Sequence, residues 1–320
     1  MNNFNWKDPF LLSEQLNEEE KLVQQSAAQF ALKELSSRLQ AALNSGGIGR
    51  KGYQLIGQAG LFGVTLPHEF GGSNASHTSY GLIAREIERI DSGFRSILSV
   101  QSSLVMYPIF KFGSNLQKQT YLKKLGSGEL IGCFGLTEPE AGSDPAGMRT
   151  TAIKTADGYR INGSKTWISN ASIADIFIIW AKSEEDNGKI RGFIIERGTK
   201  GLQTNKIDGK LSMQSVDTGS IYLSNVDVKK TSILPNVVGL KGPFSCLNLA
   251  RYGICWGVMG AAEDCWFRSY EYGMQRHQFS RPLAATQLYQ KKLVDMQIEI
   301  TLGLQACLRL GQLMDSQNAT

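Results

Sequence analysis

The sequence predicts an α+β protein in which an all-α N-terminal segment, a middle antiparallel β segment and a C-terminal α-helical segment follow one another. Three observations support this order. Residues 1–130 carry apolar side chains at helical spacings. Residues 131–238 hold short β-branched and aromatic runs between turn dipeptides, and residues 239–320 return to two long helical patterns. We expect these three ranges to be the domains.

The first long helix is predicted to begin after Asn17. Asn17 can cap the helix, and the acidic run Glu18–Glu20 suits its positive end. Gly46 and Gly47 are expected to end it. The apolar positions of this pattern are Leu32, Leu35, Leu39 and Leu43. Further helices are expected near residues 80–90, 96–112 and 116–125.

Turn signals divide the middle segment into strands. The turns expected between antiparallel strands are Asp157-Gly158, Asn162-Gly163 and Asp186-Asn187-Gly188. From Pro243 onwards, one helix is expected to about residue 275 and another from about residue 283 to 314. The predicted order is therefore α, then β, then α.

The composition excludes several classes of protein. A hydrophobic content of 42% and a charged content of 20% are typical of a globular chain. The net charge of +5 is spread along the sequence, which argues against a nucleic-acid partner but suits a small ligand that carries phosphates. No apolar run is long enough for a membrane span, and the first ten residues lack a charged-then-apolar leader. We expect a cytoplasmic protein.

The pattern of cysteines also indicates a cytoplasmic protein. They are widely separated or lie in apolar segments, without a C-x-x-C pair, so we expect all of them to be reduced and buried. These residues are Cys133, Cys246, Cys255, Cys265 and Cys307.

Two glycine-rich segments are excluded as nucleotide sites. Gly47–Gly52 matches G-x-G-x-x-G but follows a helix instead of a strand, so we expect a loop there. Gly158–Lys165 has Ser164 where a phosphate loop requires lysine. No residues have the spacing of a metal site or the order of a hydrolase triad, and we expect neither a metal nor a covalent nucleophile.

The segment from Gly135 to Gly147 carries the strongest chemical signal. Its glycines, Gly135, Gly142 and Gly147, permit positive backbone angles and close approach, so its N–H groups can face an anionic or heteroaromatic ligand. Thr137 and Ser143 add hydroxyl groups. A surface turn would explain the glycines and a proline but not the hydroxyls.

The same thirteen residues, GLTEPEAGSDPAG, resemble the signature of the acyl-CoA dehydrogenases, and the later segment KTWISN is similar to the second flavin-contacting strand of that family. The resemblance implies a β-barrel-like middle domain, a C-terminal helical bundle and FAD as the cofactor. The residues that it assigns to the flavin in these segments are Phe134, Leu136, Thr137, Gly142, Ser143, Trp167, Ile168 and Ser169.

Two of these residues have defined roles in the family pattern. An indole covers one flavin face, and a hydroxyl two residues later bonds the reactive ring nitrogen; here these groups are Trp167 and Ser169. Relatives commonly have Thr at the second position, and a serine preserves the hydroxyl. The alternative is that Trp167 fills the core of the β domain.

A third block resembles the family residues that reach the FAD of a neighbouring subunit. Arg276 begins an R-x-x-F pattern that ends at Phe279, and Gln287 follows. Arg276 would meet the pyrophosphate through charge-assisted hydrogen bonds, which implies an oligomer, a tetramer in the family. By itself, such an arginine is more often a solvated charge at a helix end.

A fourth block is similar to glutaryl-CoA dehydrogenase. The resemblance includes DSGFRS from Asp91, SVQSSLVMYPI, GPFSCLNLARYGI and QLYQKKLVDM. It implies that Arg95 and Ser96 hold the distal carboxylate of glutaryl-CoA and that Glu88 orients the arginine. Without the family match, a surface arginine or one paired with Asp91 is the expectation. The residues assigned to the thioester arm are Ser143, Phe244, Leu247, Asn248 and Arg251.

The pattern departs from the family at its end. The family base, a glutamate in a Tyr-Glu-Gly-Thr stretch, is expected beyond Thr320, so we expect an incomplete bundle and an inactive chain. Glu138 in the signature is expected to be structural. The implied complete activity is oxidative decarboxylation of glutaryl-CoA to crotonyl-CoA and CO2, with an electron-transfer flavoprotein as acceptor. The alternatives are a monocarboxylic short-chain acyl-CoA dehydrogenase and a non-catalytic flavin or acyl-CoA binding remnant.

Overall fold

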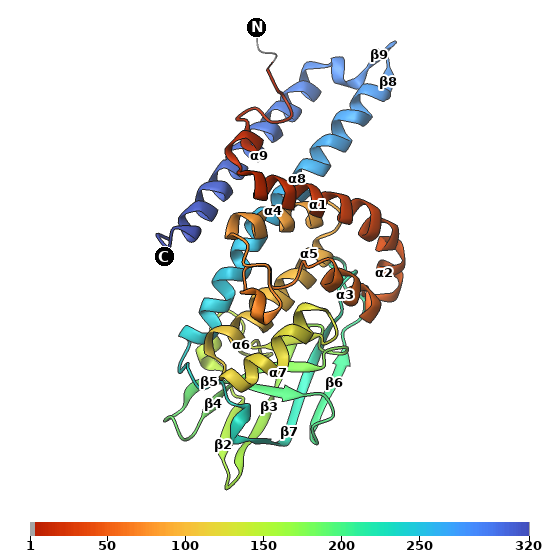
Figure 1. Ribbon diagram of the computed structural model, residues 1–320. Coiled ribbons are helices and arrows are strands. Elements are labelled where there is room, and N and C mark those ends of the chain that lie inside the picture. The colour runs from red at the N-terminus through yellow and green to blue at the C-terminus, as the bar shows by residue number, and fades with distance from the viewer. Residues whose placement is uncertain (1–3, 320) are drawn as a thin grey trace. The chain divides into compact units, whose positions relative to one another are not determined.

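The structure, a computed structural model, describes residues 4–319 (Figure 1). The described chain forms two compact units that interleave along the sequence. Unit 1 consists of residues up to 37, 76–95 and from 252 onwards, and unit 2 consists of residues 38–75 and 96–251. The three domain ranges expected from the sequence stay a prediction.

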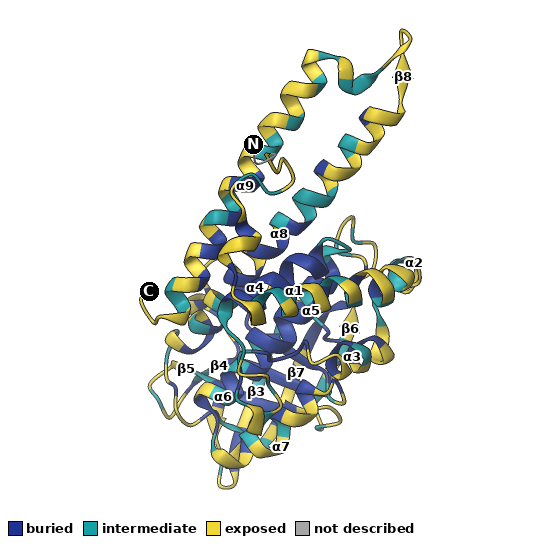
Figure 2. Ribbon diagram, turned by 45° about the horizontal axis from the view of Figure 1, so that its top comes forward, coloured by how far each residue is buried: buried dark blue, intermediate teal, exposed yellow. Residues whose placement is uncertain are grey.

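Unit 1 is helical. It contains α1 (Glu18–Phe30), α4 (His77–Glu88), residues 252–275 of α8 (Lys241–Gln275) and α9 (Gln287–Asp315). The helices α8 and α9 form an antiparallel hairpin that is closed by the short strands β8 (His277–Gln278) and β9 (Arg281–Pro282). The helix α4 packs against both α1 and α9, and it is dark blue in Figure 2 because almost all of it is buried.

The start of α1 is as the sequence predicts. The Asn17 side chain accepts a hydrogen bond from the Glu20 N–H at 2.9 Å, and the Glu20 carboxylate accepts one from the Asn17 N–H at 3.0 Å. This reciprocal pair is a capping box. After Phe30 the chain continues through π and 3-10 turns into α2 (Leu39–Ser45), which ends at Gly46 with a φ of 69°. Of the four predicted leucines, Leu35 is the one that is buried.

Close packing of α8 on α4 requires glycine. A Cβ at Gly260 would lie 2.0 Å from the Arg85 carbonyl oxygen, and a Cβ at Gly257 would lie 2.0 Å from a Glu88 carboxylate oxygen. Real Cβ atoms do not approach other atoms so closely, so these positions let the two helices meet. The contact places α8 directly over the charged face of α4.

Unit 2 contains a seven-stranded sheet. The strands are β1 (Gly132–Gly135), β2 (Thr151–Lys154), β3 (Gly158–Ser169), β4 (Ile176–Ser183), β5 (Lys189–Glu196), β6 (Leu202–Lys206) and β7 (Thr218–Lys229). Their order is β1-β4-β2-β3-β7-β6, and β5 pairs with β4. The pairs β1–β4 and β2–β4 are parallel, so the expectation of a purely antiparallel sheet is wrong. Parallel pairing follows from long connections between these strands, which the turn dipeptides do not reveal.

One predicted turn is also wrong. Asp186-Asn187-Gly188 lies between strands as expected, and Asp157 lies in the turn before β3, which begins at Gly158. Asn162-Gly163, however, lies inside β3, where the register against β7 shifts. An Asn-Gly pair can serve a bulge as well as a turn, because both need an unusual backbone angle. Gly163 has a φ of 149°, and a Cβ there would collide with Thr150.

Besides α2 and the start of α8, unit 2 contains three helices, of which α6 and α7 lie against the sheet in Figure 1. They are α3 (Gly49–Gln58), α6 (Tyr107–Phe112) and α7 (Asn115–Gly126), and a π-helical stretch from Val100 to Met106 connects α5 (Ser92–Ser99) to α6. The expected loop over residues 47–52 is wrong from Gly49 onwards, where α3 begins. Burial of Tyr53 and Ile56 stabilises this helix despite its glycines.

The expectation that all the cysteines are buried is wrong for two of them. Cys133, Cys246 and Cys307 are buried, but Cys255 and Cys265 on α8 are exposed. The apolar residues of α8 surround the helix, so its sequence does not reveal which face is covered.

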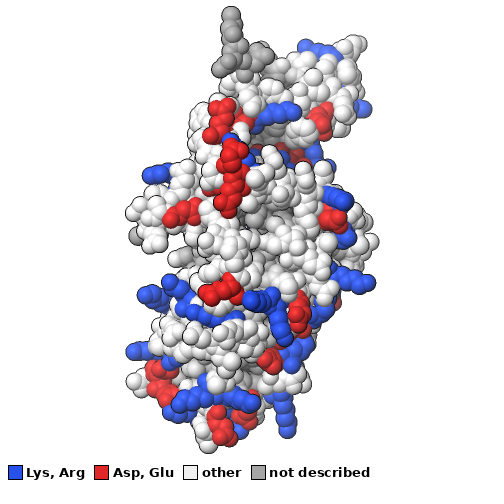
Figure 3. Space-filling view, in the orientation of Figure 1, with Lys and Arg blue, Asp and Glu red and all other residues white. Residues whose placement is uncertain are grey.

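Charged side chains of both signs are interspersed over the face shown in Figure 3, as expected from the sequence. No described helix is long and apolar enough to cross a membrane.

Candidate functional site

A cleft in unit 2 brings together residues from four parts of the chain. Its volume is about 370 Å³. All eight residues that the sequence assigns to the flavin in the signature and in KTWISN line this cleft, as do four of the five residues assigned to the thioester arm. The lining residues are Val100, Leu104, Phe134, Leu136, Thr137, Gly142, Ser143, Pro145, Trp167, Ile168, Ser169, Phe244, Leu247 and Arg251.

The signature loop follows β1 and is folded by its own acidic residue. Residues Glu138 and Ala141 exchange two backbone hydrogen bonds of 3.1 Å in a tight turn. The Glu138 carboxylate then accepts hydrogen bonds from the N–H groups of Arg149 at 2.6 Å and Thr150 at 3.0 Å. Glu138 is therefore structural, as expected, and its contacts hold both ends of the loop.

The glycines of this loop act differently from the expectation. None of Gly135, Gly142 and Gly147 has a positive φ. A Cβ at Gly135 would lie 2.5 Å from Ile179, so this glycine serves the packing of the strand. A Cβ at Gly142 would meet nothing within 4 Å, so this residue faces open space. The expectation of positive angles is wrong because close packing, not turn geometry, requires the first glycine.

The indole of Trp167 projects from a bulge in β3. The register against β7 shifts between Lys165 and Ile168, and Trp167 has a φ of 58°. This left-handed conformation is unfavourable for a residue with a Cβ. The bulge turns the side chain out of the sheet, where 63% of the residue is exposed. The alternative that Trp167 fills the core of the β domain is therefore wrong.

The polar groups of the cleft are open to a ligand. The hydroxyl groups of Thr137, Ser143 and Ser169 are arranged around it, and none of them has a hydrogen-bond partner among the described residues. A flat indole, several hydroxyl donors and apolar side chains suit a heteroaromatic ring system with polar edges. This donor set fits a flavin.

One residue assigned to the thioester arm lies outside the cleft lining, and three lining residues were not predicted. Asn248 is exposed and accepts a hydrogen bond of 3.1 Å from Arg251, so it orients a residue of the cleft instead of lining it. Val100, Leu104 and Pro145 line the cleft without having been singled out. Val100 and Leu104 lie in the π-helical stretch. Both belong to the segment SVQSSLVMYPI, whose resemblance to the family could have indicated them.

Unit 1 contains the arginine assigned to the substrate. Arg95 is buried, and its Nε donates to a Glu88 carboxylate oxygen at 2.5 Å. This is the orienting contact that the resemblance implies. The alternatives of a surface arginine and of an Asp91 partner are not what the structure shows, because Asp91 instead accepts hydrogen bonds from the N–H groups of Gly93 and Phe94. Among the described residues, no hydrogen bond or ion pair engages the two terminal nitrogens of Arg95. Ser96 is half-buried.

The third predicted block lies at the tip of the α8–α9 hairpin. Arg276 and Gln287 are exposed, and Phe279 is 95% exposed with a φ of 53°. These side chains are free to meet another molecule. Their contact with the cofactor of a neighbouring subunit stays a prediction.

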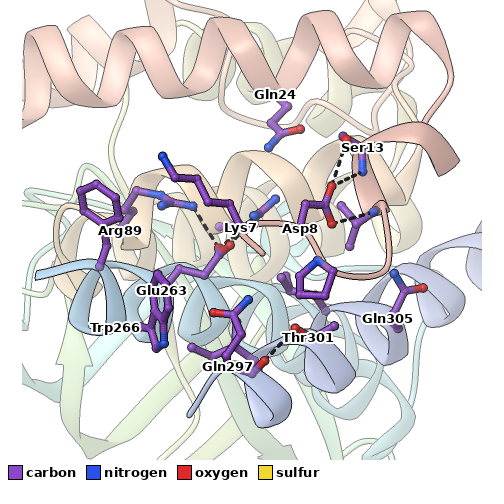
Figure 4. Close-up of a pocket in the computed structure, with 16 residues that line it drawn as sticks. Lys7, Asp8, Ser13, Gln24, Arg89, Glu263, Trp266, Gln297, Thr301 and Gln305 are labelled. Atoms are coloured by element: carbon purple, nitrogen blue, oxygen red, sulfur yellow. Dashed lines mark hydrogen bonds and ion pairs between the residues drawn. The ribbon is translucent and has the colours of Figure 1, made fainter. Parts of the chain in front are cut away.

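A second cavity, of about 280 Å³, lies in unit 1 between the N-terminal segment and the helices (Figure 4). Its charges neutralise one another. Glu263 accepts two hydrogen bonds from Arg85, of 2.6 and 2.5 Å, and one of 2.9 Å from Arg89. Asp8 accepts hydrogen bonds from the N–H groups of Leu12 and Ser13. The contacts of Glu263 hold the C-terminal end of α4 against α8, and those of Asp8 fold the N-terminal segment on itself.

The fold and the cleft define a class of protein, one of helices and a β sheet with an exposed indole at a cleft that suits a flavin. Family models for the acyl-CoA dehydrogenase N-terminal, middle and C-terminal domains match residues 17–129, 133–226 and 239–320. The chain belongs to the acyl-CoA dehydrogenase family.

Two curated relatives illustrate the range within the family. An acyl-CoA dehydrogenase of Bacillus subtilis is 39% identical over 250 residues, which are 76% of this chain and 66% of the relative. A glutaryl-CoA dehydrogenase of Desulfococcus multivorans is 35% identical over 251 residues, which are 77% of this chain and 64% of the relative. The matched stretches thus span slightly less than two thirds of these relatives.

Solved structures match almost the whole chain. A glutaryl-CoA dehydrogenase from Mycobacterium smegmatis in complex with FADH2 is 36% identical with a TM-score of 0.96, over 99% of this chain and 81% of that chain. A butyryl-CoA dehydrogenase from Megasphaera elsdenii is 30% identical with a TM-score of 0.88, over 94% of this chain and 81% of that chain. The earlier expectations of an incomplete bundle and an inactive chain have no support in the structure or in these relatives. Thr320, on which they rest, lies outside the described residues.

Proposed function

We propose that this chain binds FAD and functions in an acyl-CoA dehydrogenase whose substrate is glutaryl-CoA. The observation that carries the proposal is the shared cleft of unit 2, in which the signature loop and the bulge of β3 meet. The solved glutaryl-CoA dehydrogenase from Mycobacterium smegmatis contains FADH2, which supports the choice of cofactor. The implied reaction yields crotonyl-CoA and CO2.

The residues of the cleft have complementary roles in this proposal. The indole of Trp167 covers one face of the flavin, and the hydroxyl groups of Thr137 and Ser169 donate hydrogen bonds to its polar edge. FAD, when bound, supplies the acceptor for a hydride from the substrate. The apolar lining excludes water from the reacting atoms. Ser143 and Arg251 contact the thioester arm.

The choice of a dicarboxylic substrate rests on Arg95. A buried guanidinium without a partner is costly, and Glu88 supplies one partner at Nε. The two terminal nitrogens form a fork that matches a carboxylate. We therefore assign the distal carboxylate of glutaryl-CoA to this fork, with Ser96 as a further donor.

Three further assignments rest on the family resemblance. The base that removes the α-proton is a glutamate, and no residue that lines the cleft in the described part of the chain carries a carboxylate. The electron acceptor is an electron-transfer flavoprotein. The assembly is a homo-oligomer in which Arg276, Phe279 and Gln287 reach the cofactor of a neighbouring subunit.

The test is ligand binding to the FAD-loaded chain. Glutaryl-CoA and butyryl-CoA are titrated separately, and the change in the visible flavin spectrum gives the dissociation constants. Arg95→Leu is expected to weaken glutaryl-CoA about tenfold or more, because a charge-assisted pair is lost, while butyryl-CoA binds as before. Arg89→Leu is the matched control, since Arg89 pairs with Glu263 in the second cavity. Equal losses of affinity for both ligands in the Arg95 variant would refute the assignment of the distal carboxylate to Arg95.

The same experiment distinguishes two other functions from the proposed one. A monocarboxylic acyl-CoA dehydrogenase is favoured by the similarity to the Megasphaera elsdenii butyryl-CoA dehydrogenase, and it predicts tighter binding of butyryl-CoA. A non-catalytic binding remnant predicts that both ligands perturb the flavin spectrum but that neither reduces the flavin when oxygen is excluded. A chain that takes up no FAD would refute both dehydrogenases and a flavin-binding remnant.

A further inference from the structure

We propose that Lys165 and Glu138 are positioning residues for the flavin site, because their buried pair ties the loop that carries Thr137 to the strand that carries Trp167. The inference rests on the proposed function. Neither residue lines the cleft, so the effect on the cofactor is indirect.

The pair joins two segments that face the cleft. The Lys165 ammonium donates hydrogen bonds to the Glu138 carboxylate at 2.8 Å and to the Leu136 carbonyl at 3.1 Å. One residue further along the strand, the Thr166 N–H donates to the Thr137 carbonyl at 2.9 Å. The spacing between the signature loop and β3 is therefore set by three consecutive contacts.

A charged pair at this position is not needed for packing alone. The Lys165 side chain is completely buried, and removal of its charge from water opposes folding. Burial lowers the pKa of Lys165 to about 8, and the hydrogen bond to Glu138 opposes this shift. A methionine would fill the same volume without that penalty. What the ammonium adds is a directional link to two acceptors on the loop.

The link also holds an unfavourable backbone. Trp167 has a φ of 58° and lies two residues after Lys165. On the other side of the bulge, the Asn170 side chain donates to the Gly132 carbonyl at 2.9 Å. The contacts of Lys165 connect β3 to the loop after β1, and the contact of Asn170, directly after β3, connects to β1 itself. Strained conformations persist where surrounding contacts determine them, so this arrangement fixes the direction of the indole.

Two variants isolate the link. Glu138→Gln keeps an acceptor oxygen for Lys165 and removes the carboxylate charge. The double variant Glu138→Gln/Lys165→Met has the same loop residue but lacks the side-chain link from Lys165, while the backbone hydrogen bond of Thr166 remains. Their comparison therefore cancels any effect of the glutamine on the loop itself. Arg191→Met is a control for loss of a partly buried ion pair outside the cleft, since Arg191 pairs with Asp186 at 3.0 Å.

The measurements are the FAD dissociation constant, the visible circular dichroism of bound FAD and the thermal midpoint of each protein without FAD. We expect the double variant to be at least as stable as Glu138→Gln, because it no longer buries an ammonium without a charged partner. We expect it nevertheless to bind FAD about tenfold more weakly and to change the circular dichroism of the flavin. Arg191→Met should lower the midpoint and leave FAD affinity unchanged.

A purely structural role predicts the opposite pattern, in which FAD affinity follows stability. Equal FAD affinity and an unchanged flavin spectrum in the two Glu138 variants would overturn the positioning role while the proposed function stands. Absence of FAD binding by the unaltered chain would instead overturn the proposed function, and the inference would be lost with it. If the double variant does not fold, Glu138→Gln decides alone, because the link predicts that its FAD affinity stays near that of the unaltered chain.

Discussion

The left-handed conformation of Trp167 leads to a prediction with an unusual sign. Replacing a strand residue by glycine normally destabilises a protein more than replacing it by alanine, because glycine has more freedom in the unfolded chain. At Trp167 the φ of 58° penalises alanine but not glycine. Both substitutions remove the same indole, so their difference isolates the backbone.

The magnitude follows from two opposing terms. The left-handed conformation costs a residue with a Cβ about 1–2 kcal/mol, which Trp167→Gly avoids. The extra freedom of glycine in the unfolded chain costs about 0.5–1 kcal/mol. Trp167→Gly should therefore be more stable than Trp167→Ala by roughly 0.5–1 kcal/mol. Both variants should bind FAD more weakly than the unaltered chain, since both lack the stacking ring.

The assay is urea unfolding of the proteins without FAD. Tyr222 on β7 provides the control, because it is partly exposed in a paired strand and has no positive φ. Tyr222→Gly should be less stable than Tyr222→Ala by about 0.5–1 kcal/mol, the ordinary order. If the Trp167 pair follows the same order as the Tyr222 pair, the reasoning about the bulge is refuted.

Three other predictions concern stability. Gly257→Ala should lower the free energy of unfolding by about 1–3 kcal/mol in urea titrations, because the new Cβ would overlap the Glu88 carboxylate; an unchanged value would show that α8 can move away. Burial opposes ionisation of Asp315, but hydrogen bonds from the first two residues of α4 outweigh it and lower its pKa. The ionised form of Asp315 therefore stabilises the fold above the ordinary pKa of 3.8, and this contribution is lost as the pH falls through the lowered pKa. Asp315→Asn should therefore destabilise the protein at pH 7 but not in strong acid. A difference in the free energy of unfolding between the two proteins that stays constant from pH 7 to strong acid would contradict this prediction. Gln101→Leu leaves a buried N–H and two carbonyls unpaired and should cost about 1–3 kcal/mol or more by thermal unfolding, whereas a loss well below that would mean that water replaces the amide.

Local signals in the sequence account for the predictions that were confirmed. The cap at Asn17, the end of the helix at Gly46 and the turn at Asp186–Gly188 each depend on residues within a few positions. The order of helical and β segments follows from the period of the apolar residues in the same way. These features need no knowledge of distant contacts.

The predictions that failed each depended on a distant partner. The parallel pairing of β1 with β4 requires knowing how segments far apart in the chain meet. The helix at Gly49 is stabilised by burial of its apolar face, which overrides the low helix propensity of glycine. The exposure of Cys255 depends on which side of an apolar helix is covered.

The sequence by itself determined the chemistry of the candidate site. The residue types of the signature loop and of KTWISN predicted the hydroxyl groups and the indole that line the cleft, because a cofactor would constrain those types directly. Only the tertiary structure decided their presentation. The bulge that turns Trp167 outward, the burial of Lys165 against the loop and the pairing of Arg95 with Glu88 all arise where separate segments pack. Such contacts are properties of register and packing, and a sequence encodes them only through the complete fold.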